Sequence, residues 1–106
     1  MNKSVTLRVR DSGLNSDKAA RLAEMLRALA HPLRLRIVSL LCQEDRRVNA
    51  LVELLGARQA IVSQQLRILR MSRLVFVARD KAGMTYRISE PRLRNLMRCL
   101  RECSTD

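Results

Sequence analysis

The stretch VNALVELLGARQAIVSQQLRILRM, residues 48–71, decides the predicted fold of this chain. Apolar residues recur at helical spacing in residues 48–55 and again in residues 59–71, and Gly56 supplies a helix stop between them. Two short helices joined by a turn that contains glycine form a helix-turn-helix arrangement. The residues expected to face inward are Leu51, Val52, Leu54 and Leu55 on the first helix and Ile61, Val62, Leu66 and Leu69 on the second.

Downstream of this stretch the apolar period changes from that of a helix to that of a strand. Residues 74–79 and 84–88 read as two strands, and residues 80–83, which end in glycine, read as the turn between them. A hairpin that directly follows a helix-turn-helix is typical of a wing. The predicted fold class is therefore mainly α with a small β-hairpin (α+β), a winged helix-turn-helix.

Three further helices complete the prediction. The first begins at Asn15 or Ser16 and ends before His31-Pro32, where Pro32 starts the second helix, which ends in the charged run at residues 44–47. Residues 89–91 open the last helix, whose apolar stripe is Leu93, Leu96, Met97 and Leu100. We expect residues 1–14 to be a flexible arm and residues 15–106 to be one winged helix-turn-helix domain of the kind that binds DNA.

Composition points to a nucleic-acid partner. The 106 residues include 21 Lys and Arg against 10 Asp and Glu, a formal net charge of +11, and most of the surplus is arginine. Guanidinium groups bind phosphates and guanine edges in a two-pronged way. Charge alone also fits plain solubility, or attraction to RNA or an anionic membrane.

The same composition sets expectations about location and catalysis. No stretch is apolar for long enough to cross a bilayer, and the odd number of cysteines, three, fits a reducing compartment. A cytoplasmic protein with no membrane partner is expected. The sequence has no Gly-rich phosphate loop and no catalytic cluster of His, Cys or carboxylates, so we do not expect an enzyme.

The polar face of residues 59–71 carries the candidate DNA-reading residues. Gln and Arg side chains pair with adenine and guanine edges in the major groove, and Ser bonds to bases or phosphate. An ordinary solvated helix face is the alternative. The candidates for base contacts are Gln59, Ser63, Gln64 and Arg67, and those for contacts to the DNA backbone are Arg70, Arg73, Arg79, Lys81 and Arg87.

Two stretches carry a family resemblance: LRALAHPLRLRI, residues 26–37, and VSQQL, residues 62–66. With the hairpin that ends at Thr85-Tyr86, they resemble the ArsR/SmtB family of bacterial repressors over about residues 18–103. The resemblance implies a homodimer paired through the first and last helices, which represses a nearby operon until an inducer binds. Residues 58–66 are similar to the BigR-like persulfide sensors within that family.

The three cysteines are the candidate sensor. Cys99 and Cys103 are spaced i, i+4 and share a helix face, while Cys42 ends the second helix. The persulfide sensors that the chain resembles carry one cysteine on the second helix, at the place of Ser39, and one near the end of the last. The family's arsenic site uses a cysteine pair at the start of the third helix, but residues 48–50 here are Val-Asn-Ala. The family's zinc site uses Asp and His on the last helix, which has no His here. His31, the one histidine, is expected to be structural.

The resulting prediction is a homodimeric, sequence-specific repressor that leaves double-stranded operator DNA when reactive sulfur or an oxidant modifies its thiols. One alternative has arsenite or another soft ion held by Cys42, Cys99 and Cys103. Another is a constitutive DNA-binding protein in which Cys42 and Cys99 are small buried apolar residues and Cys103 is an idle exposed thiol. A protein-interaction module is a further alternative. No bound cofactor is expected.

Overall fold

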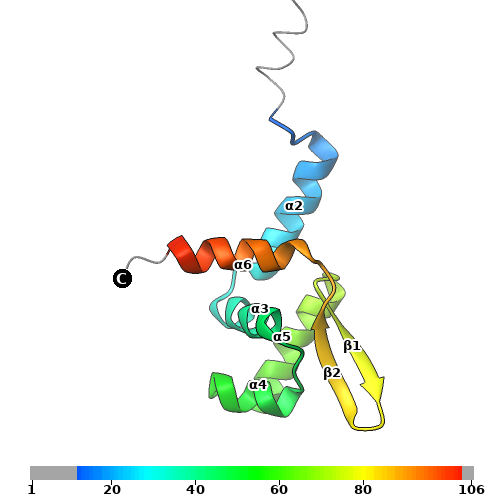
Figure 1. Ribbon diagram of the computed structural model, residues 1–106. Coiled ribbons are helices and arrows are strands. Elements are labelled where there is room, and N and C mark those ends of the chain that lie inside the picture. The colour runs from blue at the N-terminus through cyan, green and yellow to red at the C-terminus, as the bar shows by residue number, and fades with distance from the viewer. Residues whose placement is uncertain (1–11, 104–106) are drawn as a thin grey trace, which may run out of the picture.

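The computed structural model describes residues 12–103, so the predicted arm at residues 1–14 lies mostly outside the described part. Within this part the chain forms five helices and one hairpin (Figure 1). In chain order they are α2 (Ser16–Leu29), α3 (Pro32–Gln43), α4 (Val48–Leu55), α5 (Gln59–Met71), β1 (Val75–Asp80), β2 (Gly83–Ile88) and α6 (Arg92–Cys103).

The helix-turn-helix prediction is confirmed, with α4 and α5 at the predicted bounds. Gly56 ends α4 in the left-handed conformation, at φ 62°, and its N–H donates to the carbonyl of Val52 at 2.9 Å. A residue with a Cβ is strained at such a φ, which is why glycine stops this helix.

The wing is an antiparallel hairpin in which Val75 pairs with Ile88 and Asp80 pairs with Gly83. Strand β1 is shifted by one residue from the predicted range 74–79, and β2 begins one residue before the predicted range 84–88 and ends with it. The segment between α3 and α4 joins it through a β-bridge: the N–H of Arg46 donates to the carbonyl of Tyr86 at 3.2 Å, and the N–H of Tyr86 donates back to that of Arg46 at 2.8 Å. The base of the wing is therefore tied to the helix-turn-helix.

The core lies around α3, which packs against α2, α4, α5, α6 and β2. Its largest fully buried side chains are Ile37, Val38, Leu41, Leu51, Val62, Leu66, Leu69 and Leu93. Burying each of them stabilises the fold by about 1.5–3 kcal/mol.

Two residues predicted to face inward do not. Leu54 of α4 is 50% exposed and Ile61 of α5 is 42% exposed. The apolar stripe on each of these short helices is wider than the surface that its neighbours cover. The helical spacing therefore predicted correctly which side of each helix is buried, but it did not predict where the buried surface ends.

The junction between α2 and α3 is built by His31 and Pro32. The Nδ1 atom of His31 accepts a hydrogen bond from the N–H of Leu33 at 3.1 Å and so caps α3, which confirms the structural interpretation of this histidine. Pro32 occupies the first turn, where a missing N–H costs nothing.

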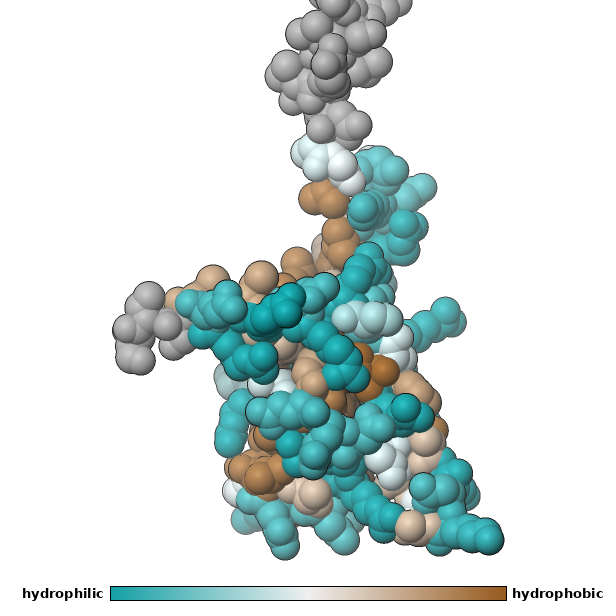
Figure 2. All heavy atoms as spheres, in the orientation of Figure 1, coloured by the Kyte–Doolittle hydropathy of each residue, from teal (hydrophilic) through white to brown (hydrophobic). Residues whose placement is uncertain are grey.

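Helices α2 and α6 leave much of their apolar surface uncovered. Only Ala28 and Leu29, at the end of α2, are buried, whereas Leu26 is 51% exposed and Leu100 of α6 is 44% exposed. In Figure 1, α2 extends away from the body of the protein, and Figure 2 shows apolar residues along it where it stands above α6. A search of residues 12–103 finds no helix able to span a membrane.

Candidate DNA-binding surface

The second helix of the helix-turn-helix, α5, is the candidate recognition helix. Its buried side is formed by Val62, Leu66 and Leu69, which are fully covered. The four predicted base-contacting residues, Gln59, Ser63, Gln64 and Arg67, are all exposed. The core therefore holds α5 by one side and leaves uncharged and cationic hydrogen-bonding groups on the other.

A hollow of about 550 Å³ lies at the carboxyl half of this face. It is lined by Ser63, Arg67, Arg70, Met71 and Tyr86. Tyr86 belongs to β2, so the hollow joins the recognition helix to the wing. Two guanidinium groups at its edge suit a phosphate or a base edge.

The cationic residues of the wing differ in their exposure and in their contacts with the rest of the protein. Arg79 and Lys81 are exposed at the end of β1 and in the turn, which the Asp80 carboxylate shapes by accepting from the N–H of Ala82 at 2.8 Å.

Arg87 has partners within the protein. Its guanidinium pairs with the Asp45 carboxylate at 2.9 Å and stands 5.5 Å from the centre of the Phe76 ring. Arg87 is thus held in place, with part of its charge already balanced by Asp45.

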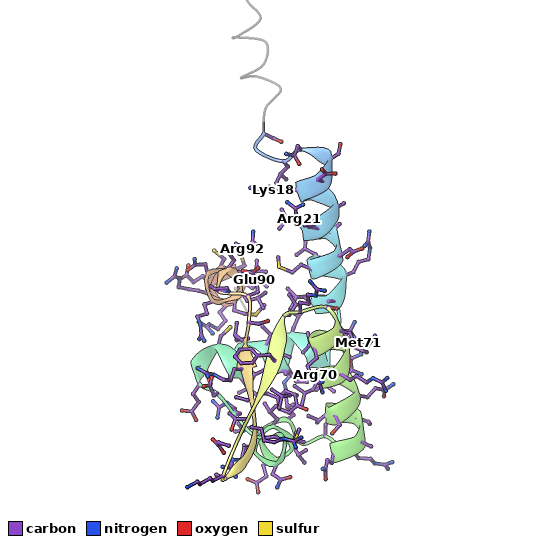
Figure 3. The ribbon with its side chains drawn as sticks, turned by 90° about the vertical axis from the view of Figure 1, so that its right-hand side faces the viewer. Lys18, Arg21, Arg70, Met71, Glu90 and Arg92 are labelled. Atoms are coloured by element: carbon purple, nitrogen blue, oxygen red, sulfur yellow. The ribbon has the colours of Figure 1, made fainter. Side chains whose placement is uncertain are left out.

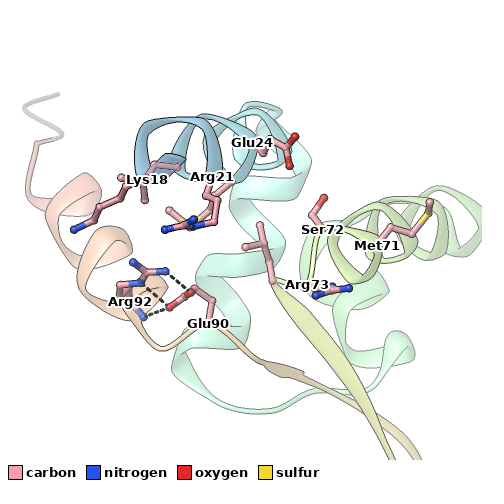
Figure 4. A pocket seen from close by; sticks show the side chains of 11 residues that line it. Lys18, Arg21, Glu24, Met71, Ser72, Arg73, Glu90 and Arg92 are labelled. Atoms are coloured by element: carbon pink, nitrogen blue, oxygen red, sulfur yellow. Dashed lines mark hydrogen bonds and ion pairs between the residues drawn. The ribbon is translucent and has the colours of Figure 1, made fainter. Parts of the chain in front are cut away.

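Arg73 lies apart from the other predicted DNA-backbone contacts, and it does not line the hollow beside Tyr86. It has φ 62°, which turns the chain from α5 toward β1, and it lines a second hollow of about 560 Å³. Lys18 and Arg21 extend into that hollow from α2, opposite Glu90 and Arg92 (Figures 3 and 4).

The Arg92 side chain hydrogen-bonds the Glu90 carboxylate at 2.8 and 3.0 Å, and the Arg92 N–H adds a bond at 3.0 Å. The side-chain bonds first, then the backbone bond, lower the pKa of Glu90 to about 2. An ion pair of this chain therefore occupies one edge of the second hollow.

The sequence alone did not indicate the role of three residues near this surface, which are Arg34, Arg47 and Gln65. Arg47 precedes α4, yet its guanidinium lies beside the wing turn, 3.6 Å from where a Cβ of Gly83 would stand. Gln65 is buried on α5, and Arg34 of α3 donates to it. Each of these contacts joins distant parts of the chain, so no local pattern reveals it.

The three cysteines lie in different surroundings. Cys42 is half-buried against the core, and its carbonyl accepts from Nη1 of Arg94, on α6, at 2.6 Å. Burial raises the pKa of the Cys42 thiol, while Arg94 and Arg101 act in the opposite direction. Cys99 and Cys103 are exposed, so the description of Cys99 as a buried apolar residue is wrong for one protomer.

These positions also bear on metal binding. Among residues 12–103, no three His, Cys, Asp or Glu side chains stand close enough together to hold a metal ion. The three thiols therefore do not form a soft-ion site within one protomer.

Comparison with known proteins identifies the family. Residues 31–76 match the family described as bacterial regulatory protein, arsR family. An HTH-type transcriptional regulator of Mycobacterium tuberculosis is 38% identical over 81 residues, which cover 76% of this chain and 71% of that protein.

Two solved structures share the fold. The transcriptional repressor BigR from Xylella fastidiosa superposes with a TM-score of 0.78 at 28% identity, covering 99% of this chain and 100% of that one. A homodimeric winged helix-turn-helix DNA-binding domain from Mycobacterium bovis gives 0.71 at 30% identity, covering 85% and 86%. These three relatives are a transcriptional regulator, a transcriptional repressor and a DNA-binding domain, and this chain belongs to the ArsR family of bacterial transcriptional regulators.

Proposed function

We propose that the protein is a homodimeric repressor that recognises a specific operator in double-stranded DNA. The observation that carries this proposal is the exposed polar face of α5, which a hollow connects to Tyr86 of β2, together with the exposed cations of the wing. Helix α5 enters the major groove, and the wing lies over the flanking backbone or minor groove.

The residues divide into two roles on this surface. Gln59, Ser63, Gln64 and Arg67 read base edges, while Arg70, Arg79, Lys81 and Arg87 bind the backbone. Arg47, beside the wing turn, joins the backbone group. The backbone contact of Arg73 stays a prediction, because this side chain lines the second hollow instead.

A second copy of the chain completes the binding unit. The uncovered apolar residues on α2 and α6, among them Leu26 and Leu100, supply a surface for pairing through these helices. The related domain from Mycobacterium bovis is homodimeric. A dimer presents two recognition helices, so we expect a pseudo-palindromic site with half-sites about one helical turn apart.

Sequence-specific DNA binding is tested by selecting the duplexes that the protein binds from a random library and then measuring their affinity by fluorescence anisotropy. Gln64→Ala should weaken binding to the selected site by about 1–3 kcal/mol per half-site and relax the preference at one base pair, because a two-pronged base contact is lost. Gln43→Ala, an exposed glutamine at the end of α3, is the matched control. Selection that yields no preferred sequence would favour a non-specific DNA-binding protein, and no duplex binding at low salt would favour a protein-interaction module.

We further propose that thiol chemistry releases the repressor. Cys42 lies where α3 and α6 are joined by the Arg94 bond, so a change at this thiol alters the packing of α6 on the DNA-binding core. Two thiols that react with an organic trisulfide form one disulfide and lose two protons and two electrons. The trisulfide takes these up and is cleaved to a thiol and a persulfide.

Titration of the DNA-bound protein with an organic trisulfide, and separately with arsenite, tests this step. The expected result is release by the trisulfide that excess reductant reverses. Cys42→Ser should prevent it, and so should Cys99→Ser or Cys103→Ser, whichever of these two exposed thiols is the partner of Cys42. Release by arsenite alone would indicate a soft-ion site made by thiols of both subunits, since one protomer brings no such site together. Binding indifferent to both reagents would indicate a constitutive DNA-binding protein.

A further inference from the structure

The two stretches that carry the family resemblance meet at one side-chain contact. Nη1 of Arg34, on α3, donates to Oε1 of Gln65, on α5, at 2.8 Å, although 31 positions separate the two residues. The same guanidinium reaches a third helix, because Nε of Arg34 donates to the carbonyl of Ala28, near the end of α2, at 2.5 Å. One side chain therefore connects α2, α3 and the recognition helix.

The sequence explains why the Ala28 carbonyl needs this donor. Helix α2 ends at Leu29, so the Ala28 carbonyl is among the last four of the helix, which have no partner inside it. Residue 32, four positions on, cannot supply a donor either, because it is proline and has no N–H. Ala28 is itself buried, at 7% exposed, so water has little access there. Arg34 supplies the missing donor, and its positive charge suits the negative end of α2.

Gln65 is unlike its neighbours on the recognition helix. Ser63 and Gln64 are exposed toward the proposed DNA, whereas Gln65 is only 9% exposed and is the one buried polar residue of the described core. A buried amide on this helix does not read bases. Its bond to a charged donor is directional, so it fixes the position of α5 more closely than apolar packing does.

We propose that Arg34 and Gln65 are positioning residues that hold the recognition helix at a set place relative to the carboxyl end of α2. This inference rests on the proposed function. Helix α2 carries the uncovered apolar surface proposed for pairing, so the contact connects the dimer helix to the helix that reads DNA. It thereby sets the distance between the two recognition helices of a dimer, and with it the half-site spacing that the dimer accepts.

The test uses the full chain and duplexes selected from a random library with the wild-type protein, together with versions whose half-sites are one base pair closer or farther apart. Gln65→Met, of similar size but without an acceptor, should weaken binding to the selected site about tenfold, by the worth of one bond to a charged group. It should also reduce the discrimination against the altered spacings. Binding to mixed-sequence DNA should change little, while the melting temperature should fall by several degrees because Arg34 loses a partner.

Three further variants separate positioning from plain stability. Gln65→Glu keeps an acceptor for Arg34 and should restore both affinity and spacing preference. Arg34→Met combined with Gln65→Met should lose no more spacing preference than Gln65→Met alone, because the single change already breaks the link between α2 and α5. The double variant also removes the bond to the Ala28 carbonyl, and that extra loss should show only as a lower melting temperature. Arg36→Met, which removes an exposed arginine from the same helix, should keep the wild-type spacing preference.

The outcomes distinguish this inference from the proposed function. A wild-type protein with no preference for any selected sequence would defeat the proposed function. A wild-type protein with a clear spacing preference that Gln65→Met leaves intact would overturn the positioning role alone. Equal losses of affinity for the selected site and for mixed-sequence DNA would also overturn it, because they indicate a structural role only.

Discussion

Replacing Lys81 by glutamine isolates one proposed backbone contact of the wing. Lys81 is exposed in the turn between β1 and β2, and its side chain supports no part of the core, so the fold should be unaffected. Each phosphate contact to B-DNA contributes about 0.9 to the slope of log K against log salt concentration. A dimer has two wings, so Lys81→Gln should make the slope less steep by about 1.8.

The same relation gives the loss of affinity. At about 0.15 M salt, one contact is worth about 0.7 log units, and the two contacts of a dimer amount to about a 30-fold loss of affinity. Near 1 M salt the difference should vanish, because little is then gained by releasing counterions. Anisotropy titrations over a range of salt concentrations measure both quantities.

Lys18→Gln provides the matched control. Lys18 is an exposed lysine on α2, at the far end of the molecule from the wing (Figure 3), so its replacement removes the same charge elsewhere. Its salt slope should equal that of the wild type. An unchanged slope for Lys81→Gln, or the same change in both variants, would show that the wing tip does not contact the backbone and would refute the reasoning.

Other predictions concern stability and thiol reactivity. His31→Ala removes the cap of α3 and should cost about 1 kcal/mol, which calorimetry would record as a melting temperature lower by roughly 4–8 °C. The pKa of Glu90 is lowered to about 2 in the folded protein, so its stabilising contribution should be present above about pH 5 and lost as the pH falls toward about 2. The gap in melting temperature between wild type and Glu90→Gln should therefore close over that range, and a constant gap would count against the ion pair. With a thiol reagent at neutral pH, Cys99 and Cys103 should react faster than Cys42, which is half-buried and has a raised pKa; peptide mapping would show the order.

Helix bounds were predictable where the chain itself supplies the stop. Gly56 ends α4 because its left-handed φ is an intrinsic preference of glycine, and Pro32 begins α3 because proline suits a first turn. Such signals act within a few residues, and they gave the helix-turn-helix and the polar face of α5.

Burial at the margins and long-range contacts were not predictable in the same way. The exposure of Leu54 and Ile61 depends on how far the neighbouring helices reach, which their own spacing does not record. The contact between Arg34 and Gln65 depends on the packing of three helices. One local sign did exist, because Pro32 leaves the Ala28 carbonyl in need of a donor.

The bridge between Arg46 and Tyr86 divides the wing into two parts with different tolerance to change. On the side of the bridge next to the helices, a third segment of backbone shares the hydrogen bonds, and an inserted residue would disturb the packing of α4. On the other side of the bridge, away from the helices, the turn at residues 80–83 is an exposed loop tip, where insertions are best tolerated. Lengthening or exchanging that tip offers a way to extend the footprint of the protein on DNA while the rest of the domain folds as before.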